Sequence, residues 1–166
     1  MTTEPELEHP SPENARSPMK TWRLLFLDCQ ENIEELKKAG TDAGYVVVGA
    51  VEVAEAWAVL DGKDHVDVIV CAAHLEDESM FAFLAAVRAN EVHRDARFLI
   101  LSVEPSAAAA MLDTSTARSS RALGADAYAV MPTFDPAKLI SLVSELQPAV
   151  PMLQQSSTPA NKHRSE

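Results

Sequence analysis

The sequence has little positive charge, and this shortage limits what the protein can bind. It contains 14 Lys and Arg residues against 25 Asp and Glu residues, for a formal net charge of -11. A general nucleic-acid surface needs clustered basic side chains to neutralise phosphates. Because such clusters are missing and no groove-reading motif is visible, we expect no nucleic-acid partner.

Long apolar runs, a basic leader and grouped cysteines are also missing. No run approaches the roughly 20 residues that a membrane-spanning helix needs, and the N-terminus is polar and proline-bearing rather than basic and then apolar. Cys29 and Cys71 lie far apart and lack metal-ligand spacing. We therefore expect a soluble cytoplasmic protein with no membrane contact and no structural disulfide.

The chain divides into one predicted domain and two tails. With 166 residues, 47% of them hydrophobic, it is long enough for one well-buried core. Residues 1–19 carry prolines among acids and small polar residues, which predicts a disordered arm. Residues 20–147 form the predicted domain, and residues 148–166 return to Pro, Gln, Ser and Thr, which predicts a flexible tail.

Five apolar segments read as strands. The most distinctive is residues 66–72, VDVIVCA, an almost unbroken run rich in β-branched residues. This pattern is typical of a strand buried on both faces of a parallel sheet. The other four predicted strands are residues 21–28, 45–50, 97–102 and 127–131.

Amphipathic segments between these strands predict helices. The first runs over about 32–43, with Asn32 as its N-cap and Gly44 ending it. The second is centred on residues 53–60, and the third begins near Met80. A fourth, long or broken, precedes Gly124, and Asp135 caps a fifth.

The alternation of strands and helices predicts an α/β fold with a doubly wound, five-stranded parallel sheet in a three-layer α/β/α arrangement. In such sheets ligands gather at the carboxyl ends of the strands. Those ends carry Asp28, Ala72, Ser102 and Met131.

Four motifs, LLFLDCQEN, VDVIVCAAHL, FLILS and GADAYAVMP, follow in the order found in one known family. Together they resemble the receiver domain of two-component response regulators over about residues 20–147. The resemblance implies a flavodoxin-like sheet of order 2-1-3-4-5. In active receivers, acids after the first strand and an aspartate ending the third hold Mg²⁺. That aspartate accepts a phosphoryl group, which a Thr or Ser and a lysine then recognise.

This chain departs from that pattern at the chemical positions. Asp28 matches the first acid, but Cys29 replaces the second and Ala72 falls at the phosphoacceptor position. Ser102 keeps the hydroxyl, whereas Met131 replaces the lysine before Pro132. Alanine cannot be phosphorylated, and Asp28 alone is only a residual metal candidate unless Glu76 or Asp77 contributes. We expect no cofactor and no enzymatic activity.

The resemblance and its departures predict a stand-alone pseudo-receiver that acts as a phosphorylation-independent interaction module in bacterial signal transduction. Its expected partners are a histidine kinase, another regulator or a second copy of itself. The implied contact face consists of the fourth helix, the fifth strand and the fifth helix, with Tyr128 as the switch aromatic. Phe81, Ile140 and the alanines of residues 107–110 are candidate contacts.

Two alternatives stay open from the residues. One is a small flavodoxin-like cofactor-binding protein or enzyme, although no glycine-rich phosphate loop follows Asp28 and Cys29 with His74 lacks a third orienting group. The other is a receiver phosphorylated at a non-standard site, Asp28 or Asp67. Asp67 is expected at the start of its strand, away from the pocket. The acids of residues 76–78 are expected to form a solvated loop.

Overall fold

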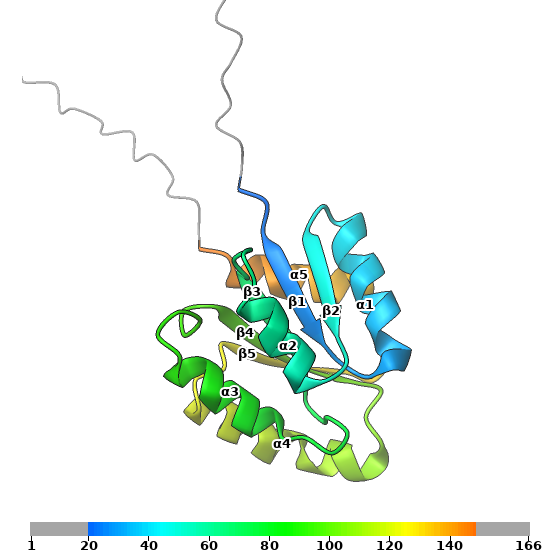
Figure 1. Ribbon diagram of the computed structural model, residues 1–166. Helices are drawn as coiled ribbons and strands as arrows, with labels where there is room; N and C mark the ends of the chain where they lie inside the picture. The colour runs from blue at the N-terminus through cyan, green and yellow to red at the C-terminus, as the bar shows by residue number, and fades with distance from the viewer. Residues whose placement is uncertain (1–19, 149–166) are drawn as a thin grey trace, which may run out of the picture.

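The computed structural model describes residues 20–148, in which five strands alternate with five helices (Figure 1). The predicted arm, 1–19, and the predicted tail beyond residue 148 lie outside the described residues. The strands are β1 (Arg23–Leu27), β2 (Val46–Ala50), β3 (Val68–Ala72), β4 (Arg97–Val103) and β5 (Ala127–Met131). The helices are α1 (Gln30–Asp42), α2 (Val53–Leu60), α3 (Met80–Ala89), α4 (Ala107–Ala122) and α5 (Pro136–Leu146).

All neighbouring strands pair in parallel, and their order is β2-β1-β3-β4-β5. This confirms the predicted doubly wound, flavodoxin-like sheet. Strand β3 lies at the centre between β1 and β4, and all five of its residues are buried. The unbroken apolar run therefore has the environment that it predicts, because helices cover it on both faces.

Alternate residues of each strand build two cores, one on each face of the sheet. Phe98 and Ile100 of β4 contribute to the core under α2 and α3. Leu99 and Leu101 contribute to the core under α1 and α5. The result is the three-layer arrangement in Figure 1, in which helices cover both faces of the sheet.

Helix ends confirm one predicted cap and correct another. Asp135 caps α5, since its Oδ1 accepts hydrogen bonds from the backbone N–H groups of Ala137 and Lys138 at 3.0 and 3.2 Å. Helix α1, however, begins at Gln30 with Cys29 at the N-cap, so the prediction of Asn32 as the cap is wrong. The Asn32 side chain instead donates back to Asp28, at the end of β1, over 3.0 Å.

Helix α4 is continuous over 16 residues, so it is long and not broken. Its buried residues are polar, Thr116 and Ser120, whereas Met111 and Leu112 are 86% and 55% exposed. Ser120 satisfies its own hydroxyl by donating to the Thr116 carbonyl over 2.6 Å. Because its larger apolar side chains face outward, α4 is held to the sheet with little hydrophobic burial.

Candidate functional site

A pocket of about 500 Å³ lies at the carboxyl ends of β1, β3 and β4, beside the first turns of α4. Four of the six residues that the sequence placed there line it: Asp28, Cys29, Ala72 and Ser102. The loops that follow the strands and the start of α4 complete its wall. The site therefore forms where ligands gather in sheets of this type.

Met131 and Pro132 do not line this pocket. Met131 is only 1% exposed and packs in the core under α1 and α5, together with Ala129 of the same strand. Pro132 is exposed to solvent. A thioether gains from burial where a lysine would have to extend its ammonium to solvent or to the pocket. Position 131 thus supplies core packing in this chain.

Asp28 is buried, and its carboxylate is engaged in the turn between β1 and α1. Its Oδ1 accepts hydrogen bonds from the backbone N–H of Cys29 at 2.7 Å and from the side chain of Asn32 at 3.0 Å. Burial raises the pKa of Asp28, and the bonds from Asn32 and Cys29 lower it less. The carboxylate therefore stabilises the turn that leads from β1 into α1.

Replacing Asp28 by asparagine is expected to stabilise the protein slightly at neutral pH. A carboxyl whose pKa is raised by folding holds its proton more tightly in the folded state, so its contribution to stability falls as the pH rises through that pKa. The asparagine side chain keeps an oxygen acceptor without the buried charge, and the gain over wild type should shrink as the medium becomes acidic. Urea unfolding across this pH range measures it, with Glu35→Gln on the exposed face of α1 as the control. A large loss of stability at neutral pH would contradict this account.

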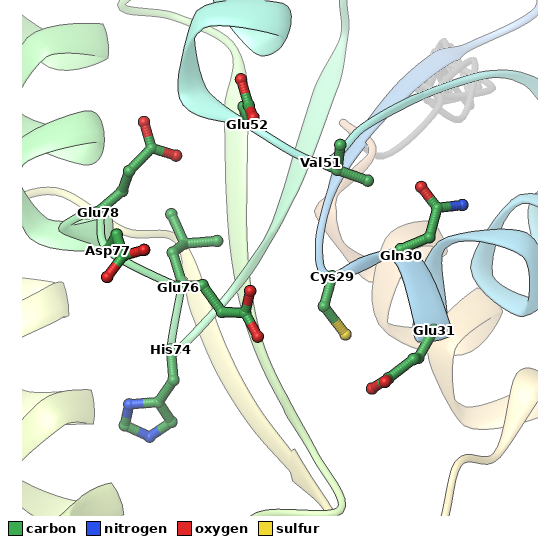
Figure 2. Close-up of a pocket in the computed structure, with 10 residues that line it drawn as sticks. Cys29, Gln30, Glu31, Val51, Glu52, His74, Glu76, Asp77 and Glu78 are labelled. Atoms are coloured by element: carbon green, nitrogen blue, oxygen red, sulfur yellow. The ribbon is translucent and has the colours of Figure 1, made fainter.

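Cys29 and His74 both lie beside the pocket, but they do not form a reactive pair. Burial, together with the Asp28 charge, raises the pKa of the Cys29 thiol, which disfavours the thiolate nucleophile. Among residues 20–148 no hydrogen bond joins Cys29 to His74, whose side chain points away from the sulfur in Figure 2. Cys71 is fully buried, and burial raises the pKa of its thiol, in line with an inert core residue.

A second hollow of about 490 Å³ adjoins the pocket, and Figure 2 shows its acidic lining. The two hollows share the wall residues Cys29, Glu31, His74 and Glu76. Residues 76–78 are exposed, as the sequence predicts, and Glu78 accepts a hydrogen bond from the backbone N–H of Val53 at 2.9 Å. In the described part of the chain no group of three or more His, Cys, Asp or Glu residues is arranged to hold a metal ion.

Ser102 and Tyr128, the two residues at the switch positions, lie near each other but share no hydrogen bond of ordinary geometry. The Ser102 Oγ is buried without a hydrogen-bond partner among the described residues. The Tyr128 hydroxyl donates to Asp113 Oδ1 on α4 over 2.6 Å, and burial together with Asp113 raises the pKa of Tyr128. Sequence reasoning missed Asp113, although it shares a helical face with Thr116 and Ser120 at i+3 and i+7.

The predicted contact residues are less exposed than their sequence positions indicate. Phe81 is half-buried and packs against the core under α2 and α3, and Ile140 is half-buried on α5. Both stay candidate contacts. The most exposed apolar side chain of α4, Met111, was missed, together with its neighbour Leu112. A single sequence could not show which way they point, because α4 lacks a clear apolar stripe.

Comparison with solved structures identifies the fold. The chain is similar to the chemotaxis response regulator CheY4 of Vibrio cholerae, with 23% sequence identity, a TM-score of 0.65 and coverage of 77% of this chain and 100% of that one. It is also similar to a response regulator from Thermotoga maritima, with 22% sequence identity, a TM-score of 0.62 and coverage of 76% of this chain and 98% of that one. The receiver domain of a Francisella response regulator is similar at 22% sequence identity and a TM-score of 0.61, with coverage of 76% of this chain and 96% of that one. No protein-family model matches the sequence, and no curated protein sequence matches it either.

The chain therefore has the receiver fold of response regulators. Its strand order is the one that the sequence resemblance implies. None of the helices over residues 20–148 is long and apolar enough to cross a membrane.

Proposed function

We propose that this protein is a pseudo-receiver, a phosphorylation-independent interaction module in bacterial two-component signalling. One observation carries the proposal: Ala72 ends the central strand inside the pocket, at the position that the resemblance assigns to the phosphoacceptor. A methyl group offers no atom to which a phosphoryl group can be transferred. The pocket therefore keeps its place in the fold without its reactive group.

The rest of the pocket supports the same proposal. Cys29 occupies the position of the second acid, so the oxygen shell that Mg²⁺ requires is incomplete. The lysine position holds Met131, whose side chain is in the core, so no cation is available from β5 to balance a phosphoryl group. Phosphorylation would therefore require new groups for Mg²⁺ binding, for phosphoryl transfer and for recognition of the bound phosphoryl group.

The proposed contact surface is the face formed by α4, β5 and α5. Helix α4, which contributes to this face, presents Met111 and Leu112 to solvent at 86% and 55% exposure, and Leu112 also lines the pocket at the strand ends. The bond from Tyr128 to Asp113 ties β5 to α4 and so fixes the shape of the face without a phosphoryl group. Its proposed partners are a histidine kinase, another regulator or a second copy of this chain.

An affinity experiment tests this function. The immobilised protein is incubated with host extract, with and without acetyl phosphate and Mg²⁺, and each retained partner is quantified. We expect equal retention in both conditions and loss of retention in the Met111→Glu/Leu112→Glu variant. Val92→Glu, which changes an exposed valine outside this face, is the control. Retention that requires the phosphoryl donor, or that is insensitive to the α4 variant, would contradict the proposal.

The two alternatives gain no support from the geometry. A flavin nucleotide would place its phosphate in a pocket lined by acids and by no Lys or Arg. Absorbance of freshly purified protein tests this directly, because bound flavin is coloured. Asp67, the candidate non-standard phosphorylation site, is buried just before β3, at the ends of the strands away from the pocket. There it accepts hydrogen bonds from Lys20 at 2.8 Å and from the Arg23 N–H at 2.9 Å.

A further inference from the structure

The pocket and its neighbouring hollow form a continuous negative surface. Neither is lined by a single Lys or Arg, and none of their acids belongs to an ion pair among residues 20–148. A concave surface with charges of one sign concentrates the field and attracts the opposite charge. The seven acids are Asp28, Glu31, Glu52, Glu76, Asp77, Glu78 and Glu104.

A second and independent observation indicates a ligand. Ser102 lines the pocket, is only 3% exposed, and its Oγ has no hydrogen-bond partner in the described chain. A buried hydroxyl without a partner costs about 1–3 kcal/mol, so such atoms usually mark a missing partner. The hydroxyl of its neighbour Tyr128 donates to Asp113, so it could only accept from Ser102, and the two hydroxyls do not have ordinary hydrogen-bond geometry.

The chemistry of the walls specifies what would fit. The Ser102 hydroxyl and the Asp28 carboxylate are acceptors for an N–H donor of positive charge. In the same pocket wall, Ala72, Ala108 and Leu112 offer apolar contacts of the kind that a methylene chain makes. A lysine or arginine side chain combines both properties. A phosphate or carboxylate would be repelled.

We propose that this pocket binds a cationic side chain, and that its occupant is the basic segment at residues 162–164 of the same chain. That segment reads Lys162, His163 and Arg164. Beyond residue 148 the chain has these two Lys and Arg residues against one acid, Glu166, a formal charge of +1 in a chain whose total is -11. The segment thus has the charge that the pocket lacks.

The length of chain is sufficient. Gln147 donates to the hydroxyl of Tyr45 over 2.9 Å. This bond places the end of α5 beside the start of β2, at the amino-terminal ends of the strands and away from the pocket. Residue 162 follows Pro148 by 14 residues, and at about 3.3 Å per residue that length reaches about 46 Å. The longest strand, β4, has 7 residues, which correspond to about 23 Å. The segment can therefore pass around the sheet to the pocket.

Tethering makes a weak contact effective. Exposed ion pairs contribute about 0–1 kcal/mol, so a free peptide would bind weakly. A bond from a charged N–H to the buried Ser102 hydroxyl adds about 1.5–3 kcal/mol, so the ion pairs and this bond together reach about 4 kcal/mol, which corresponds to a Kd of about 1 mM. A tether of this length supplies an effective concentration on the order of millimolar, which matches that Kd at low salt. Because the contact is electrostatic, added salt should release it.

Amide chemical shifts of the full chain test the proposal. In low salt, Lys162→Gln/Arg164→Gln is expected to shift the backbone amides of Cys29, His74 and Ser102, with little change at β2 or α3. High salt should reduce the difference between wild type and variant at least several-fold. The control is Lys63→Gln/Arg94→Gln, which removes the same charge from exposed positions that line neither hollow.

The pocket side is tested by a matched pair of variants. Glu31→Gln/Glu76→Gln should abolish the tail-dependent shifts, whereas Glu34→Gln/Glu35→Gln on the exposed face of α1 should leave them intact. Shifts that are absent, that map to another surface, or that survive loss of Glu31 and Glu76 would overturn the proposal. This outcome is independent of the proposed function, because it requires no phosphoryl donor and no partner.

Discussion

Replacing Arg88 by alanine is expected to lower the free energy of unfolding by about 3 kcal/mol. The Arg88 guanidinium lies at the amino-terminal ends of the strands, on the side of the sheet away from the pocket, where it bonds to the loop before β4 and the loop before β5. It donates to the backbone carbonyls of Arg94, Ala96 and Gly124 at 2.7, 2.7 and 2.8 Å. It also forms an ion pair with Asp126 at 3.0 Å.

The loss is large because several partners are left without a donor at once. Asp126 would keep its charge, and its Oδ2 also accepts the backbone N–H of Phe98 at 2.8 Å, at the start of β4. Each bond to a charged group contributes about 1.5–3 kcal/mol, but water can replace part of this set because the Arg88 side chain is 20% exposed. The expected total is therefore below the sum of the four bonds.

Urea unfolding followed by tryptophan fluorescence measures this loss. Arg94→Ala is the matched control, since Arg94 is exposed and its guanidinium has no bonded partner within residues 20–148. Its expected change is within about 0.5 kcal/mol. Equal effects of the two substitutions would contradict the assigned role of Arg88.

Replacing Tyr128 by phenylalanine is expected to speed amide hydrogen exchange in α4 by about tenfold or more, with little change in α1 or α3. The hydroxyl bond to Asp113 is short, 2.6 Å, and its acceptor is a carboxylate, so its loss should cost about 1.5–3 kcal/mol of local stability. Helix α4 has few other anchors, because Thr116 and Ser120 bury little apolar surface. Local opening should therefore be concentrated in this helix.

Tyr45→Phe is the matched control for this experiment. Its hydroxyl also bonds to side chains, Ser144 and Gln147, but at the end of α5 away from α4. Exchange in α4 should be unchanged in this variant. If Tyr128→Phe also leaves α4 unchanged, the bond to Asp113 does not hold the helix in place.

Much of the fold follows from local patterns in the sequence. Helix α3 begins at Met80, as its pattern predicts, and the Asp135 cap forms as the pattern indicates. These predictions succeed because strong periodicity and capping chemistry act over a few residues. The strand order follows from the resemblance, and the structure bears it out.

Side-chain direction and long-range pairing could not be predicted in the same way. A motif match gives the position of residue 131, but the packing around β5 turns Met131 into the core. The pairing of Tyr128 with Asp113 joins residues on different elements, and no periodicity reports it. At Asn32 the side chain bonds to Asp28 rather than capping the helix, since both outcomes suit the same residue type.

The Ala72→Asp variant follows from the same pocket geometry. Restoring the carboxylate alone should not restore phosphorylation, because Cys29 still leaves the metal shell incomplete and Met131 remains in the core. Adding Met131→Lys would place a charged lysine side chain where the Met131 thioether is now buried, and burying that charge would cost stability. Efficient phosphoryl labelling of Ala72→Asp alone would show that Cys29 and Met131 do not prevent phosphorylation.

The central claim is that the wild-type pocket does not accept a phosphoryl group, and intact-mass measurement tests it most directly. The full chain is incubated with acetyl phosphate and Mg²⁺, beside a phosphorylatable receiver domain as a positive control, and both masses are determined without acid treatment. The account predicts labelling of the control and an unchanged mass for this protein. A stoichiometric, Mg²⁺-dependent phosphoryl adduct on this chain would contradict it.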